Sequence, residues 1–68
     1  MTLSKAILMY RAKHDMTMKQ FAEACGVTLQ TIYNVETVGQ KPSRLTRTKI
    51  ELVIGAEFEI DEDVEVDT

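Results

Sequence analysis

Residues 23–36 read EACGVTLQTIYNVE, and this stretch decides the fold. Gly26 is suited to the left-handed backbone that closes a helix, and Thr28 is a good N-cap for the helix that follows. Leu29, Ile32 and Val35 recur at helical spacing, so we expect them to form the buried side of that second helix. The opposite side carries polar, uncharged residues, which are Gln30, Thr31, Tyr33 and Asn34. The stretch predicts two short helices joined by a tight turn, the second of them with a polar outer face typical of binding.

The residues before the turn predict two helices. Thr2 or Ser4 can cap a first helix that ends near residues 14–15. Thr17 stands three residues before Gln20, which is the spacing of a capping box, and the helix it begins runs to the glycine turn.

The residues after the stretch predict a loop and one more helix. Gly39 and Pro42 mark residues 37–42 as a loop, and Ser43 can cap a fourth helix over residues 44–54, which Gly55 stops. The expected fold class is therefore all-α, a compact domain of four helices, with a fifth helix as the alternative.

Charge is divided unevenly along the 68 residues. Residues 1–55 hold eight basic and four acidic residues, a net charge of +4, whereas residues 56–68 hold seven acidic residues and no basic one, a net charge of −7. This division predicts a domain at 1–55 that faces a polyanion and an acidic tail at 56–68. Residues 57–66, EFEIDEDVEV, alternate acidic with apolar positions and predict a strand or an extended tail, and a purely solubilising tail stays open.

Composition and motifs argue against several functional classes. One cysteine and one histidine, far apart in the sequence, make neither a disulfide nor a metal site, and no cofactor motif is present. We find no paired acids, Ser-His set or phosphate loop, and we therefore expect neither an enzyme nor a small-molecule substrate. No apolar run is long enough for a membrane span, so we expect a cytoplasmic protein with no membrane partner.

A string of residues at consistent spacing identifies a known family: Arg11, Thr17, Phe21-Ala22, Gly26-Val27-Thr28, Ile32, Glu36, Gly39, Pro42-Ser43 and Ile50. The string resembles the Cro/repressor-type helix-turn-helix family of phage and bacterial transcription regulators, also called the xenobiotic-response-element family. The resemblance covers residues 11–54, roughly two thirds of the chain. It implies that the third helix, residues 28–36, reads the major groove of DNA.

The candidate DNA-binding residues follow from this reading. Gln30 and Asn34 lie four residues apart on one helix face, where both amides could address adjacent base edges, preferably adenine. Three basic residues stand around the start of the fourth helix, where the free amides of a helix N-terminus also attract phosphate. The full set is Thr28, Leu29, Gln30, Thr31, Tyr33 and Asn34 on the third helix, Lys19 and Gln20 at the start of the second, and Lys41, Arg44 and Arg47 near the fourth.

The resemblance also implies a structural ion pair and shows departures from the family pattern. Arg11 and Glu36 occupy the positions of a largely buried ion pair that ties the first helix to the third. Gly39 comes one residue later after Glu36 than is usual, although the distance from Glu36 to Pro42 is ordinary. Further departures are Met18 and Leu29 where polar contacts are common, and Arg47 and Glu51 where apolar residues are common.

Two functional hypotheses result. The first is a sequence-specific regulator that binds a double-stranded DNA operator as a homodimer in the cytoplasm of a bacterial host. The second is a protein-interaction module on the same fold, a modulator or antirepressor that binds a partner repressor protein. The fold alone does not choose between them.

Overall fold

The structure is a computed structural model, and it describes residues 1–61. Four α-helices follow one another along the chain, α1 (Leu3–His14), α2 (Met18–Cys25), α3 (Leu29–Tyr33) and α4 (Arg44–Ile54), with a π-helical turn, η1 (Asn34–Val38), directly after α3. No strand occurs within residues 1–61. The predicted all-α fold of four helices is confirmed, and no fifth α-helix occurs in this part of the chain.

Each of the four α-helices begins at a hydroxyl side chain. Thr2 accepts a hydrogen bond from the backbone of Lys5, and Thr28 and Ser43 accept equivalent bonds at the starts of α3 and α4. Thr17 forms the complete capping box with Gln20. These bonds satisfy amides that a helix start leaves without an intrahelical partner, so the helix starts follow from local sequence.

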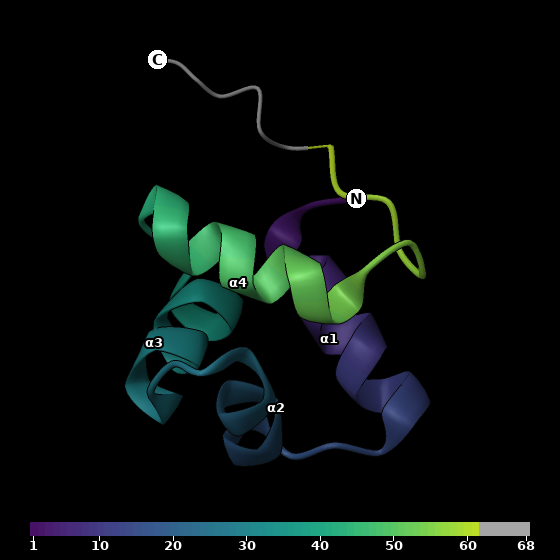
Figure 1. The fold of residues 1–68 in the computed structure, drawn as a ribbon, viewed down its shortest axis with the longest axis horizontal. Helices are drawn as coiled ribbons and strands as arrows, with labels where there is room; N and C mark the ends of the chain where they lie inside the picture. The colour runs from purple at the N-terminus through teal and green to yellow at the C-terminus, as the bar shows by residue number, and fades with distance from the viewer. Residues whose placement is uncertain (62–68) are drawn as a thin grey trace.

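The core is small and draws on all four helices. Its largest fully buried side chains are Leu3, Ile7, Phe21, Ile32, Ile50 and Ile54. Helix α4 packs against α2 and α1, and Figure 1 shows it running along one side of the domain. None of the helices in the described part of the chain has the length and apolar character that crossing a membrane requires.

The third predicted helix, residues 28–36, differs from the structure in its second half. The α-helix ends at Tyr33, and the next five residues form the wider turn η1. Gly39 closes this turn in the left-handed conformation, at φ +86°, and its N–H donates to the carbonyl of Asn34 five residues earlier. A π-helical turn contains one residue more than an α-helical turn, so Gly39 closes it one position later than the family pattern implies.

Leu29 does not belong to the buried side of α3, contrary to the periodicity argument. Its exposed fraction is 48%, whereas Ile32 and Val35 are buried as expected. Val27, which precedes the Thr28 cap, packs against the core instead. In a helix of only five residues, an apolar residue just before the cap, here Val27, can occupy the core position that helical periodicity assigns to Leu29 in the first turn.

Residues 56–61 form no strand, and they pack against the helices. Phe58 and Ile60 are half-buried against the core, and the backbone N–H of Asp61 donates to the carbonyl of Met1 at 3.1 Å. The remaining apolar positions of the predicted strand or tail, residues 64 and 66, lie outside the described residues. The domain boundary at residue 55 stays a prediction.

Candidate nucleic-acid interface

The turn between α2 and α3 fixes how α3 is presented. Gly26 has the left-handed angles φ +76° and ψ +31°, and its N–H donates to the carbonyl of Glu23. The N–H of Val27 donates to the carbonyl of Ala22 at 3.0 Å. This pair of bonds is the Schellman motif, which ends one helix and redirects the chain within two residues. Phe21 and Ala22 of α2 and Ile32 of α3 are buried in the core, and the opposite side of α3 stays exposed.

The outer side of α3 holds most of the predicted reading residues. Thr28, Leu29, Gln30 and Tyr33 are exposed, and the exposed fraction of Tyr33 is 45%. Thr31 and Asn34 are half-buried. The Thr31 hydroxyl lies 2.9 Å from that of Thr28, so both hydroxyls belong to the cap.

Gln30 and Asn34 are joined to each other. The Gln30 side-chain NH₂ donates to the Asn34 carbonyl oxygen at 2.9 Å, and the pair is exposed to solvent. Each amide has further donor or acceptor capacity beyond this bond. The two side chains therefore form one polar unit on the face of α3, which the spacing predicted only as two neighbours.

The start of α2 offers one exposed cation and one engaged amide. Lys19 and Gln20 are both exposed. The Gln20 side-chain oxygen accepts from the backbone N–H of Thr17 at 2.8 Å, so this oxygen belongs to the capping box. The NH₂ of Gln20 is the part of the side chain with capacity left for a ligand.

A hollow of about 200 Å³ lies between α3 and the start of α4. Thr31 and Asn34 line it from the α3 side, and Lys41 lines it from the loop. Gln40 and Thr46 line the same hollow and were not among the predicted residues. A loop glutamine and a threonine inside a helix carry no periodic signal, so only the folded arrangement brings them beside α3.

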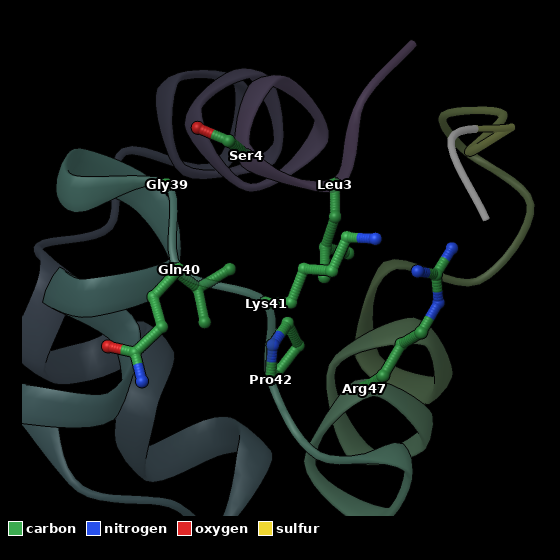
Figure 2. Close-up of a pocket in the computed structure, with 8 residues that line it drawn as sticks. Leu3, Ser4, Gly39, Gln40, Lys41, Pro42 and Arg47 are labelled. Carbon is green, nitrogen blue, oxygen red and sulfur yellow. The ribbon is translucent and has the colours of Figure 1, made fainter. Parts of the chain in front are cut away.

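Arg44 and Arg47 lie apart from this hollow. Both line a depression on the flank of α4 together with Thr48 and Ile60. The Nε of Arg47 donates to Glu51 at 2.7 Å, and this pair occupies the positions where apolar residues are common in the resembling family. Arg47 also lines a cavity of about 110 Å³ with Lys41, and Figure 2 shows both side chains extending to the same side, away from Gln40.

The comparison with family models decides the classification of this arrangement. A model described as "Helix-turn-helix" matches residues 7–59, which include all four α-helices in whole or in part. The chain belongs to the helix-turn-helix family, of the Cro/repressor type. No curated protein and no solved structure matches the chain. Membership makes double-stranded DNA the class of target and regulation of transcription the class of function, and the family is not typically enzymatic.

An ion pair ties the helix-turn-helix unit to α1. The Arg11 Nη1 donates to both Glu36 carboxylate oxygens, at 2.7 and 2.6 Å, and only 20% and 10% of the two side chains are exposed. Arg11 Nε also donates to the carbonyl of Met16 at 3.3 Å. The Ser4 hydroxyl donates to the Glu36 carbonyl at 2.7 Å. Glu36 thus joins η1 to α1 through both its side chain and its backbone.

Other reactive groups of the helix-turn-helix domain are placed away from the α3 face. Cys25 is buried, and burial raises the pKa of its thiol to about 11, so the reactive thiolate is scarce at neutral pH. His14 Nε2 lies 2.9 Å from Glu57 Oε1, at the far end of α1. Among residues 1–61, no three His, Cys, Asp or Glu side chains gather in a group that could hold a metal ion.

Proposed function

We propose that the chain is a sequence-specific regulator of the phage and bacterial Cro-repressor type, which binds its operator as a homodimer in the bacterial cytoplasm. The outer face of α3, with the start of η1, enters the major groove. The observation that carries this proposal is the solvent-exposed unit of Gln30 and Asn34 on a helix held outward by the turn at Gly26. An amide pairs with adenine through one donor and one acceptor, which is the capacity these side chains offer.

The remaining candidates divide by chemistry into base and phosphate contacts. Thr28, Leu29, Thr31 and Tyr33 flank the amide unit, and the exposed Leu29 methyls suit contact with a thymine methyl group. Lys19, Gln20, Lys41, Arg44 and Arg47 stand near the starts of α2 and α4, and their role is to fix the register of the domain on the DNA backbone.

A DNA titration tests this proposal. Duplexes bound by the full chain are first selected from a random pool, and the affinity for the selected operator is then measured by fluorescence anisotropy at about 50 and 200 mM salt. Because each phosphate contact releases counterions, six or more contacts predict a loss of about 1,000-fold in affinity between these concentrations. A selection that yields no preferred sequence, or an affinity that does not change with salt, would refute the proposal.

Two substitutions separate base reading from phosphate binding. Gln30→Ala should cost about 1–3 kcal/mol on the selected operator and relax the preference at one base pair. Lys41→Ala should weaken binding to all sequences equally and lower the salt slope by about 1. Lys5→Ala is the matched control, since Lys5 is an exposed lysine on α1 that does not line the hollow beside α3. It should leave both quantities unchanged.

A second candidate is a modulator or antirepressor that binds a partner repressor. Leu29 and Tyr33 favour it, because 48% and 45% exposure give the α3 face an apolar area suited to a protein. Glu57, Glu59 and Asp61 after α4 supply acidic groups that a basic partner surface could contact. The two candidates differ in one variant: Leu29→Ala should abolish a repressor complex, whereas it should only reduce discrimination at a thymine in an operator.

A further inference from the structure

The segment after α4 returns to the start of that helix. Ile60 lines the depression on the flank of α4 together with Pro42, Arg44 and Arg47, which stand just before α4 or in its first half. Ile60 is half-buried and packs against the core, so apolar contact holds it beside these residues. The next residue, Asp61, is therefore placed close to two arginines.

A second contact places Asp61 near the same basic residues. Its backbone N–H donates to the carbonyl of Met1 at 3.1 Å. Leu3, two residues after Met1, lines the cavity of about 110 Å³ that Lys41 and Arg47 also line. Two separate contacts thus bring the end of the described chain to one group of cations. We call this group the basic flank of α4, and its members are Lys41, Arg44 and Arg47.

The segment is anchored on α1 before it reaches the basic flank. Glu57 Oε1 lies 3.1 Å from Lys13 Nζ and 2.9 Å from His14 Nε2. Lys13 Nζ also lies 5.9 Å from the centre of the Phe58 ring, and Phe58 packs against the core. Because Glu57, Phe58 and Ile60 are all engaged, the chain passes the basic flank at a defined point.

The sequence beyond Asp61 is strongly acidic. Residues 62–68, which we call the acidic extension, hold four acidic residues and no basic one. Seven residues span at most about 25 Å, whereas Arg44 and Arg47 are about 5 Å apart along the helix axis, so the extension is long enough to cover both. A segment joined to its site by so short a linker has an effective concentration on the order of 1 mM, at which weak charge attraction gives substantial occupancy.

The basic flank has the hydrogen-bonding capacity for carboxylates. Lys41 and Arg44 are exposed, and Figure 2 shows Lys41 and Arg47 extending to the same side. The bond of Arg47 to Glu51, at 2.7 Å, is made through Nε. A guanidinium carries five N–H donors in a planar fork, so Arg47 can keep this bond and contact a further carboxylate.

We propose that the acidic extension binds the basic flank of its own molecule and competes there with DNA phosphate. Carboxylate and phosphate oxygens accept the same charge-assisted hydrogen bonds from arginine and lysine, so the two occupants exclude each other. Only molecules whose extension is displaced bind an operator with full affinity. The effect on DNA rests on the phosphate contacts of the proposed function, whereas the docking of the extension does not.

Arginine side chains report on the docking in the absence of DNA. The chain has three arginines, and Arg11 of α1 is an internal reference because it is not part of the basic flank. Nitrogen–proton correlation spectra of the full chain are compared with those of the double variant Asp63→Asn with Glu65→Gln. The Nε–H signals of Arg44 and Arg47 should move, and the signal of Arg11 should stay in place.

A matched control removes the same charges elsewhere. Asp15→Asn with Glu23→Gln also neutralises one aspartate and one glutamate, at exposed positions after α1 and on α2. It should leave the signals of Arg44 and Arg47 unchanged. Raising the salt concentration from about 20 to 500 mM should move these signals toward those of the extension variant, because salt screens exposed charges. Signals that do not move, or that move equally in the control, would overturn the inference.

The affinity for the selected operator tests the competition. The neutral extension is made by four substitutions, Glu62→Gln, Asp63→Asn, Glu65→Gln and Asp67→Asn. An extension docked in about nine of ten molecules predicts that neutralisation tightens binding about tenfold at about 50 mM salt.

A cycle of substitutions separates competition from general repulsion between the extension and DNA. The gain in affinity should disappear in a chain that carries Arg44→Gln and Arg47→Gln, because the extension has then lost its site. General repulsion would give the same gain with and without these arginines, and that result would overturn the competition.

The two assays distinguish this inference from the proposed function. A chain that binds no DNA but shows the shifts of Arg44 and Arg47 would refute the proposed function and support the docking. A chain that binds an operator while its arginine signals ignore the extension would support the proposed function and overturn this inference.

Discussion

Glu36→Ala should destabilise the domain by about 3–5 kcal/mol, which is the cost of leaving one charge of a buried ion pair without its partner. The cost of breaking a buried ion pair applies here, rather than the smaller cost for a surface pair, because Arg11 and Glu36 are only 20% and 10% exposed and are joined by two short hydrogen bonds. After the substitution, the guanidinium keeps its bond to the Met16 carbonyl, but its charge faces an apolar methyl group in place of the carboxylate.

This cost is large compared with the total stability of so small a chain. Globular domains have about 0.05–0.15 kcal/mol of unfolding free energy per residue, which gives about 3–10 kcal/mol for 68 residues. The substitution therefore removes most of the stability at the lower end of this range, and the variant should be partly unfolded at 37 °C. A double substitution, Arg11→Met with Glu36→Leu, removes both charges and should recover much of the loss.

Urea denaturation followed by circular dichroism measures the effect, and α4 supplies a matched control. Arg47 and Glu51 form an ion pair with the same donor and acceptor types four residues apart on one helix, but they are 24% and 42% exposed. Glu51→Ala should therefore cost only about 0.5 kcal/mol. If Glu36→Ala proved no more costly than Glu51→Ala, the buried pair would not hold α1 to η1, and the reasoning would be wrong.

Three further predictions concern residues away from the α3 face. Hydrogen bonds from His14 and, to a smaller extent, from Lys13 lower the pKa of Glu57 below 4.5. The ionised Glu57 therefore stabilises the fold above pH 4.5, and this contribution is lost as the pH falls through the folded-state pKa. Glu57→Gln should accordingly flatten the decline in Tm on the acid side. Cys25, with a pKa raised to about 11, should react slowly with a disulfide reagent at pH 8 in the folded chain and rapidly in urea. Gly26→Ala should cost about 1–2 kcal/mol in a thermal melt, because φ is +76° while no atom lies within 4 Å of the added Cβ; a larger loss would indicate a clash that the structure does not contain.

Features of the fold that depend on neighbouring residues could be predicted from the sequence. The capping box of Thr17 and Gln20, the cap at Thr28 and the left-handed Gly26 each involve groups within three or four residues of one another. Their geometry is set by covalent connectivity, so the residue types are sufficient. The boundaries of α2 and α4 followed from the same signals.

Features that depend on packing between elements could not be predicted. The exposure of Leu29 depends on Val27 filling the core, and helical periodicity gives no means of choosing between them. The contact of His14 and Lys13 with Glu57 joins residues more than 40 positions apart, and the alternating pattern of residues 57–66 gave only a strand or a tail. The placement of Phe58 against the core is equally non-local.

The candidate interface shows the same division. The spacing of Gln30 and Asn34 was enough to put both on one helix face, because four residues make about one helical turn. The hollow that Lys41 and Asn34 line together, and the depression that Arg44 and Arg47 line on the flank of α4, depend on how the loop and α4 pack against the other helices. Lys41 and Arg47 line one cavity although they come from the loop and from α4, and their separation in the sequence did not predict this grouping.

The wide turn η1 has a consequence for the evolution of this loop. Five residues separate Glu36 from Pro42, so each residue that the turn includes shortens the connecting loop by one. The closing glycine can thus shift by one position while the chain length stays constant. Alignments of relatives should then show the closing glycine in either of two adjacent columns without a gap. Relatives with the glycine in the position of Gly39 should keep the ion pair of Arg11 and Glu36.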